Sequence, residues 1–482
     1  MNKAPNIIYL LSDQHNPEVW GAGGDPYIRT PHLDALAAGG VSLDNCYCAS
    51  PLCVPSRSAL LSGLLPSRTG VRNNMQSLPS DKATFVHALT LDGYETVLCG
   101  RMHFVGPDQR HGYQRRLVGD ITPSSICADN EEEIYGAFKR TSNQHVISIK
   151  KSGGGNSAVL QFDRDVTEAA KACLREKRDK PLLLTVGFYG PHCPYIAPPE
   201  IYRRYYERLP EIGAIRREEY QRLHPAMRNW QDIRDLSQVT DEDVRRVRAA
   251  YYGMVEYMDG LVGELLETAE ETMDMENTVV IYGSDHGDNI GAHGLFWKTN
   301  FYEGACRVPM IFSWRGHFPA GRRLCGLTSL LDLAPTLLAI GGERRLPEYD
   351  GMDIGPCLRG EAALPEDREV FAECADIKGD APSAMLRRGK YKLILHAGYP
   401  DAQLFDLEKD PGEKEDLGTA PSLRPVVQEL LRHMDRRWNA DGAIRQLEND
   451  KAHVRLMGDW VRQEQPEPLE EWRGDPAENY LV

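Results

Sequence analysis

Three short apolar runs, each followed closely by polar residues, constrain the fold of this chain most strongly. They cover residues 6–11, 182–188 and 278–282, and their length and their content of β-branched, leucine and aromatic residues are typical of buried strands. The polar side chains that follow them are those of Asp13, Gln14, His192, Asp285 and His286. Ligands of an open α/β sheet bind at the carboxyl ends of its strands, so we expect these side chains to gather at one edge of a sheet.

Helical patterns alternate with these strands. The predicted helices span residues 31–39, 55–61, 163–177, 241–272 and 329–340. Such alternation predicts an α/β protein with a doubly wound, mostly parallel sheet. A charged stretch over residues 202–243 is predicted to be a helical insertion at the surface, and the glycine-rich residues 151–157 are predicted to be a flexible loop.

The pattern changes after about residue 358. Short strands are predicted at residues 369–374, 384–388 and 391–396, and a helix is predicted at residues 423–438. We therefore expect three units along the chain. They are a main unit over residues 1–358, a smaller C-terminal α+β unit with an antiparallel sheet over residues 359–440, and a polar, irregular tail or arm over residues 441–482.

Charge and composition argue against several classes of protein. The net charge of -15 speaks against a nucleic-acid-binding protein, which needs a basic surface. The apolar runs are shorter than a membrane span, and residues 6–11 are too short for the core of a signal peptide. We therefore predict a cytoplasmic protein that binds neither nucleic acid nor membrane. The odd number of cysteines, eleven, fits reduced thiols better than a disulfide framework.

Cys53 opens the segment Cys-Val-Pro-Ser-Arg-Ser-Ala-Leu-Leu-Ser-Gly, which ends at Gly63. The plainest interpretation is a buried thiol that precedes a proline at the start of a helix. A second interpretation is a soft-metal module built on Cys46, Cys48 and Cys53. That module has no well-spaced fourth ligand in the sequence, and it leaves the Pro-Ser-Arg after Cys53 without a role. The rest of the chain favours a third interpretation.

Four of the polar residues at the strand ends form a candidate metal site. Asp13 and Asp285 offer carboxylates, Gln14 offers an amide oxygen and His286 offers an imidazole. This set suits a divalent cation such as Ca²⁺, Mg²⁺ or Mn²⁺. Considered alone, each Asp could equally cap a loop. Their equivalent positions after two buried strands, together with Cys53, favour the metal site.

Several cationic side chains are candidates to counter the charge of an anion bound near this metal site. They are Arg57, Arg101, His103, His192 and Lys298. A single Arg or Lys is most often a solvated surface residue. His192 is more constrained, because Gly-Pro precedes it and Cys-Pro follows it, and these turn residues fix its position.

Taken in order along the chain, these segments resemble the type I sulfatases of the alkaline-phosphatase-like superfamily. The matching segments are residues 6–14, 30–37, 53–63, 100–103, 191–194, 284–287 with Lys298, 331–336 and 404–413. The resemblance implies an alkaline-phosphatase-like fold, with a large mixed, mostly parallel sheet sandwiched by helices, in which residues 1–358 are the catalytic domain. It also implies a sulfuric ester hydrolase that acts on a small-molecule or carbohydrate sulfate ester.

The resemblance further implies that a maturating enzyme converts Cys53 to formylglycine, whose hydrate is the nucleophile. Asp13, Gln14, Asp285 and His286, together with residue 53, would hold one divalent cation. Ca²⁺ is the expected cation, with Mg²⁺ and Mn²⁺ as alternatives.

The remaining roles follow from the same resemblance. Arg57 would hold the hydrate, and Arg101 would counter charge on the sulfuryl oxygens. His192 and Lys298 would protonate or stabilise the departing alcohol. His103 would deprotonate the second hydroxyl of the hydrate, which expels sulfate and restores the aldehyde.

Two residues depart from the usual sulfatase pattern. Gln14 stands where a second Asp is usual, and Arg101 stands where Lys is usual, so a rigid fork replaces a flexible point charge. An Asp-Gln pair is found in choline-sulfatase-like and phosphonate-monoester-hydrolase-like branches, which keeps phosphonate monoester or phosphodiester hydrolysis as an alternative activity. An inactive homologue that binds sulfated ligands is a further alternative. Asn74 is a candidate substrate contact, and a C-terminal arm that reaches a neighbour would fit a homo-oligomer.

Overall fold

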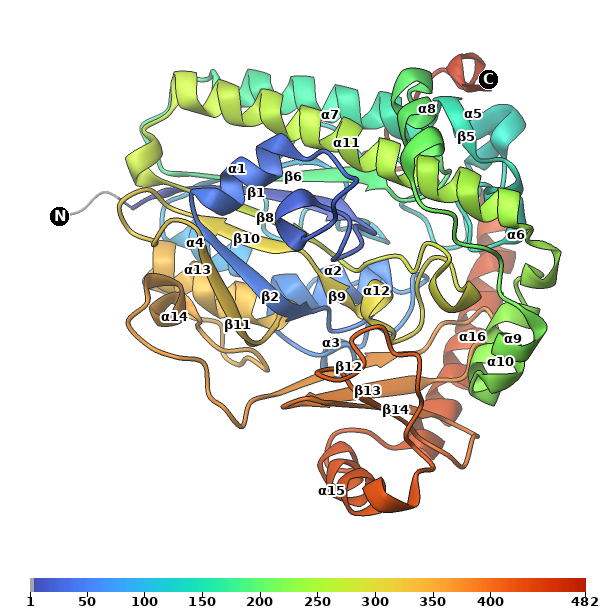
Figure 1. Ribbon diagram of the computed structural model, residues 1–482. Helices are drawn as coiled ribbons and strands as arrows, with labels where there is room; N and C mark the ends of the chain where they lie inside the picture. The colour runs from blue at the N-terminus through green and yellow to red at the C-terminus, as the bar shows by residue number, and fades with distance from the viewer. Residues whose placement is uncertain (1–3) are drawn as a thin grey trace.

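The computed structural model describes residues 4–482. Within this range nine strands form the central sheet (Figure 1). In spatial order they are β11 (Arg322–Ser329), β2 (Val41–Tyr47), β10 (Met310–Ser313), β8 (Thr278–Ser284), β1 (Asn6–Asp13), β6 (Leu182–Pro191), β3 (Glu95–Gly100) and β4 (Arg115–Arg116), with β9 (Arg307–Val308) paired to β2.

Most strand pairs in this sheet are parallel. β1 lies between β6 and β8 and is parallel to both, and β3 is parallel to β6. β10 is antiparallel to β8 and to β2, which makes the sheet mixed. The prediction of a large mixed, mostly parallel sheet is therefore confirmed. The three apolar runs of the sequence are the three adjacent strands β6, β1 and β8, so their polar ends meet at one edge.

Helices cover both faces of the sheet (Figure 1). Helices α7 (Ala158–Leu174) and α11 (Asp241–Thr272) lie on one face. Helices α2 (Cys53–Ser62), α4 (Phe85–Leu91) and α13 (Leu333–Gly341) lie on the other. Successive side chains of a strand point to opposite faces, and β1 shows this directly. Ile8 and Leu10 join the core under α7 and α11, whereas Tyr9 joins the core under α2, α4 and α13.

A smaller unit follows the central sheet in sequence. Its sheet contains β12 (Glu369–Cys374), β13 (Ser383–Arg388), β14 (Tyr391–His396) and β15 (Gln403–Asp406), and all neighbouring pairs are antiparallel. Helix α15 (Arg424–Met434) packs on this sheet through Leu430 and Met434. The predicted α+β unit with an antiparallel sheet is confirmed. The strand β15 was not among the predicted strands.

The predicted flexible loop over residues 151–157 is wrong, because this segment contains strand β5 (Gly153–Asn156). β5 pairs with β7 (Ile196–Ala197) on one side and with β16 (Tyr480–Leu481) at the end of the chain on the other. The glycines permit this close pairing: a Cβ at Gly155 would lie 1.9 Å from the carbonyl oxygen of Tyr480. The glycine-rich composition suggested a flexible loop, but the missing side chains instead leave room for the backbone of β16.

The prediction of an irregular tail is also wrong, because residues after Asn439 form helix α16 (Ala440–Glu464). The side chain of Asn439 caps this helix by accepting a hydrogen bond from the N–H of Gly442 at 2.7 Å. Few of its residues are buried, among them Leu447 and Val461, so the sequence shows little apolar periodicity.

The insertion over residues 202–243 is helical, as predicted. It contains α9 (Arg217–Arg222) and α10 (Pro225–Asp232), and α8 (Pro199–Arg208) leads into it. Among residues 4–482, none of the helices is both long and apolar enough to cross a membrane.

Candidate active site

Two carboxylates meet at the carboxyl edge of the central sheet. Asp13 is the last residue of β1, and Asp285 directly follows the neighbouring parallel strand β8. The backbone N–H groups of Gln14 and His286 both donate to Oδ1 of Asp285, at 3.1 and 2.9 Å. Both acids are fully buried. The two strand ends therefore hold two acids side by side in the interior, as the sequence predicted.

Cys53 joins these acids from the first turn of helix α2. Its Sγ lies 3.2 Å from Nε2 of His286 and 3.8 Å from Oδ1 of Asp13. Ligand atoms of Asp13, Cys53, Asp285 and His286 all lie within 4.8 Å of one another. Burial lowers the pKa of His286 to about 4, so its imidazole is neutral at pH 7 and has a lone pair to offer. Two carboxylates and a neutral imidazole fit a divalent cation.

The soft-metal module built on Cys46, Cys48 and Cys53 is not supported among residues 4–482, which the structure describes. Cys53 groups with acids and a histidine there, and neither Cys46 nor Cys48 belongs to that group. The structure has all the cysteines as free thiols.

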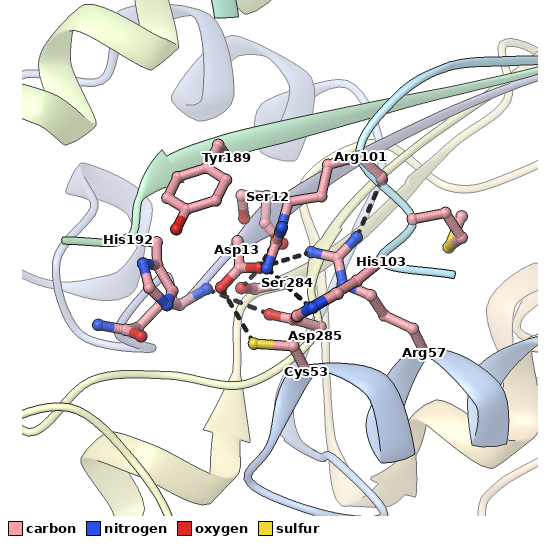
Figure 2. Close-up of polar contacts among 12 residues, drawn as sticks. Ser12, Asp13, Cys53, Arg57, Arg101, His103, Tyr189, His192, Ser284 and Asp285 are labelled. Carbon is pink, nitrogen blue, oxygen red and sulfur yellow. Dashed lines mark hydrogen bonds and ion pairs between the residues drawn. The ribbon is translucent and has the colours of Figure 1, made fainter. Parts of the chain in front are cut away.

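Two buried guanidinium groups balance the two carboxylates (Figure 2). Arg57 donates from Nε to Oδ2 of Asp285 at 2.8 Å and from Nη2 to Oδ2 of Asp13 at 3.0 Å. Arg101 donates from Nε to the same oxygen of Asp13 at 2.6 Å. Burial alone would raise the pKa of Asp13, but the surrounding cations, Arg101 first, hold that pKa well below its ordinary value. Asp13 is therefore ionised.

Asp120 orients both Arg101 and His103. Its Oδ1 accepts from Nη1 of Arg101 at 3.2 Å, and its Oδ2 accepts from the backbone N–H of His103 at 2.7 Å. Nη2 of Arg101 donates in turn to Nδ1 of His103 at 2.9 Å. Burial, followed by the charge of Arg101, lowers the pKa of His103. Because a guanidinium only donates, the neutral His103 ring carries its proton on Nε2.

Lys298 contacts Gln14, one of the predicted metal ligands. Its Nζ donates to Oε1 of Gln14 at 2.5 Å and lies 4.0 Å from Oδ1 of Asp13. Nε2 of Gln14 donates to Oδ2 of Asp288 at 2.6 Å, and Oδ1 of Asp288 accepts from the backbone N–H of Trp297 at 2.7 Å. Burial lowers the pKa of Lys298, but Cys53 and Asp13 outweigh burial and leave that pKa raised. Lys298 is therefore a buried cation.

His192 reaches the same edge from the end of β6. Asp163 holds this strand end, because its carboxylate accepts from the N–H groups of Tyr189 at 2.7 Å and Gly190 at 2.9 Å. Nδ1 of His192 lies 2.7 Å from the carbonyl oxygen of Cys193, so Nδ1 is the donor and Nε2 of the neutral ring accepts. Burial, followed by the charge of Lys298, lowers the pKa of His192 well below its ordinary value.

A cavity of about 420 Å³ opens onto these groups. Among its lining residues are Cys53, Asn74, Arg101, His103, His192 and Lys298. Asn74 does more than line the wall: its Oδ1 accepts from the N–H of Val54 at 3.0 Å, which braces the residue after Cys53. Arg57 and the four predicted metal ligands, Asp13, Gln14, Asp285 and His286, are not among the lining residues. Six of the predicted site residues therefore line one cavity.

Family models and a curated relative decide the family. A model described as Sulfatase matches residues 5–343, and a model described as N-sulphoglucosamine sulphohydrolase, C-terminal, matches residues 291–440. The choline-sulfatase of Rhizobium meliloti (strain 1021) is 36% identical over 443 residues, which cover 89% of this chain and 85% of that protein. The chain belongs to the sulfatase family. The resemblance inferred from the motifs is confirmed, and the protein is a sulfatase-family hydrolase.

Other relatives of this sulfatase-family enzyme have related names or folds. Arylsulfatase K of Mus musculus is 24% identical over 507 residues, covering 96% of this chain and 88% of that protein. The crystal structure of the phosphonate monoester hydrolase of Agrobacterium radiobacter has a TM-score of 0.74 at 25% identity, covering 89% of this chain and 94% of that one. A structure in complex with its substrate D-glucosamine-2-N,6-O-disulfate has a TM-score of 0.71 at 20% identity, covering 93% and 99%, and shows the shared fold.

Sequence reasoning missed several residues of this sulfatase site. Asp120 and Asp163 hold Arg101 and the end of β6, yet neither lies in a motif or directly after a predicted strand. Asp288 lies three residues after Asp285, and no sequence pattern indicates that its side chain contacts Gln14. The cavity wall also contains charged residues of two further segments: Asp129 and Glu131 at the start of α5, and Asp376 and Lys378 between β12 and β13. Contacts between distant segments place all of these side chains.

Proposed function

We propose that this enzyme hydrolyses a sulfate monoester to an alcohol and inorganic sulfate, with formylglycine formed from Cys53 as the source of the nucleophile. One observation carries the proposal. Cys53 lies at the cavity wall within 4.8 Å of the ligand atoms of two buried acids and a histidine, where Arg101 and Lys298 also line the cavity. This combination supports the proposal, because it would put a modified side chain, a candidate metal site and fixed cations beside one bound anion.

Asp13, Gln14, Asp285 and His286 would hold the cation. Three of these four residues offer oxygen, which favours a hard cation such as Ca²⁺. When bound, such a cation supplies positive charge that favours ionisation of the nucleophile at position 53.

The first step is a displacement at sulfur. One hydroxyl of the aldehyde hydrate first loses its proton to solvent. Its oxygen then forms a bond to sulfur, the bond from sulfur to the alcohol oxygen breaks, and the electron pair of that bond stays on the alcohol oxygen. Lys298 is the acid that donates a proton to the departing alcohol, because its ammonium is charged and lines the cavity. His192, neutral and with Nε2 as acceptor, orients the alcohol. Arg101 donates to the sulfuryl oxygens.

The second step releases sulfate. The remaining hydroxyl of the modified residue loses its proton, its oxygen forms the carbonyl double bond, and the carbon–oxygen bond to sulfate breaks. His103 takes this proton on Nδ1 once Arg101, which donates to that nitrogen in the structure, donates to the sulfuryl oxygens instead. An unmodified Ser or Cys could not finish this way, because it has no second hydroxyl that can collapse to a carbonyl.

Phosphonate monoester hydrolysis is the second candidate. The observation that favours it is the likeness to the Agrobacterium radiobacter phosphonate monoester hydrolase, at a TM-score of 0.74 and 25% identity. Both activities would use the same nucleophile and the same cations.

Paired kinetics on one preparation decide between the two activities. The kcat/KM for an aryl sulfate, choline sulfate and a sulfated glucosamine would be compared with that for an aryl phosphonate monoester. Cys53→Ala serves as the control that removes the nucleophile. The proposal predicts that a sulfate ester has the highest kcat/KM, whereas a preference for the phosphonate, or no turnover of any sulfate ester, would overturn it.

A further inference from the structure

The end of the chain returns to the catalytic edge of the molecule. After α16, the chain reaches a 3-10 turn (Pro476–Glu478) that contacts helix α5 (Glu131–Tyr135), and it ends at β16, which pairs with β5 (Figure 1). Both family models match only residues up to 440. Residues 469–472, which we call the strap, make the contacts that matter here.

The strap holds the backbone of Asp120 on both sides. The N–H of Asp120 donates to the carbonyl oxygen of Glu470 at 2.9 Å, and the N–H of Trp472 donates to the carbonyl oxygen of Asp120 at 2.7 Å. Oε1 of Glu471 accepts from the backbone N–H of Ser124 at 2.8 Å and from its hydroxyl at 2.9 Å. The strap therefore fixes the stretch from Asp120 to Ser124, which includes part of the cavity wall.

Trp472 anchors the strap to helix α7. Its side chain is buried, and its ring packs edge-on against Phe162 with 5.5 Å between ring centroids. Nε1 of Trp472 donates to Oδ2 of Asp165 at 2.8 Å. Because α7 packs on the central sheet, the strap connects Asp120 to a rigid part of the fold.

Gly119 makes the close contact between the strap and Asp120 feasible. A Cβ at this position would lie 2.0 Å from the carbonyl oxygen of Glu470. Side-chain atoms do not approach a carbonyl oxygen that closely, so any other residue at this position would push the strap away. The chain thus has a glycine where its last segment must approach.

We infer that the strap is a positioning element for the anion-binding groups of the active site. The backbone of Asp120 is held by the strap, while its side chain holds Arg101 and the N–H of His103. Asp120 therefore connects the strap directly to Arg101 and His103, which line the cavity. The kinetic part of this inference rests on the proposed sulfatase activity, whereas the structural part does not.

Gly119→Ala tests the inference with a change outside the strap. The added methyl group must displace the Glu470 carbonyl by about 1 Å or more, and a misplacement of this size at catalytic groups costs about 100-fold in rate. We expect kcat/KM for a sulfate ester to fall about 100-fold. We also expect faster hydrogen exchange at the amides of Met102 and His103, which both donate to Asp120, with unchanged exchange in β1 and β8.

Arg110→Ala is the matched control. Arg110 forms an exposed ion pair with Glu470 at 2.8 Å, on the solvent side of the same strap residue. Exposed pairs of this kind contribute little, so this variant should keep wild-type kinetics and exchange.

Trp472→Ala gives a second variant in case Gly119→Ala does not fold. It releases the strap from α7 and should have the same two effects, and Trp472→Phe, which keeps ring packing, should restore most of the activity. In the variant with both Gly119→Ala and Trp472→Ala the losses should not add, because the released strap no longer meets the methyl group.

Wild-type exchange at Met102 and His103, together with wild-type kcat/KM, in the folded Gly119→Ala and Trp472→Ala variants would overturn the inference. Additive losses in the double variant would also overturn it. If the wild-type enzyme turns over no sulfate ester, the proposed function fails, and the exchange measurements still decide whether the strap positions these residues.

Discussion

The hydrogen bonds of Gln14 allow a substitution that changes charge and donor pattern without changing shape. Nε2 of Gln14 donates to Oδ2 of Asp288 at 2.6 Å, and Oε1 accepts from Nζ of Lys298 at 2.5 Å. Gln14→Glu replaces the donor nitrogen by an acceptor oxygen of nearly the same size. Two acceptors then face each other across a distance that only a shared hydrogen makes favourable.

The magnitude follows from three contributions at this buried position. Repulsion between two carboxylates about 4 Å apart is about 4 kcal/mol at an effective dielectric constant of about 20. Attraction between the new carboxylate and Lys298 is of similar size and opposite sign, so the two Coulomb contributions largely cancel. The lost hydrogen bond to a charged group remains, and it costs about 1.5–3 kcal/mol. We therefore expect the free energy of unfolding to fall by about 2–3 kcal/mol.

Urea unfolding at pH 8 on chelator-dialysed protein measures this change, with the m-value as a check that the unfolded surface is the same. The control is the variant with both Gln14→Glu and Asp288→Asn, in which donor and acceptor exchange places. The side chain at position 288 can then donate to position 14 and to the hydroxyl of Tyr195, which lies 2.6 Å from Oδ2 of Asp288. Stability should be largely restored. Wild-type stability in Gln14→Glu, or additive losses in the double variant, would refute the reasoning.

Two further predictions concern buried charges outside the cavity. Lys392→Met removes a buried cation that lies 2.8 Å from Glu303 and 2.5 Å from Glu413, so thermal unfolding should report a loss of about 3–5 kcal/mol, whereas Lys390→Met, in a more exposed pair, should cost about 1 kcal/mol or less. Burial raises the pKa of Asp163 to about 7, above its value in the unfolded chain, so its contribution to stability is lost as pH rises through about 7. The stability deficit of Asp163→Asn should therefore shrink by about 2–3 kcal/mol between pH 5 and pH 8, and a constant deficit would contradict this assignment.

The strands that build the site could be predicted because their signals are local. β1, β6 and β8 are continuous apolar runs, and burial on both faces of a parallel sheet requires such runs. Asp13 and Asp285 follow two of these runs closely, so adjacency of the strands was enough to bring the acids together. The segment after Cys53 is also local: it predicted a helix over residues 55–61, and the structure has α2 there, beginning two residues earlier at Cys53.

The positions of Asp120 and the strap could not be predicted, because backbone hydrogen bonds between distant segments leave no side-chain pattern. At Gly119 and Gly155 the missing side chain leaves room for the backbone of the C-terminal segment. In the sequence, however, a glycine is equally compatible with a flexible loop. Helix α16 was not predicted, because few of its residues are buried and most are polar, so the sequence lacks the apolar periodicity of a packed helix.

The chemical state of Cys53 tests the central claim most directly. Mass spectrometry of the peptide that contains Cys53 should be performed on the same preparation whose turnover of a sulfate ester is measured. The account predicts that the thiol is replaced by an aldehyde oxygen, that the modified fraction tracks kcat across preparations, and that Cys53→Ala is folded and inactive. A fully active preparation in which Cys53 is unmodified would contradict it.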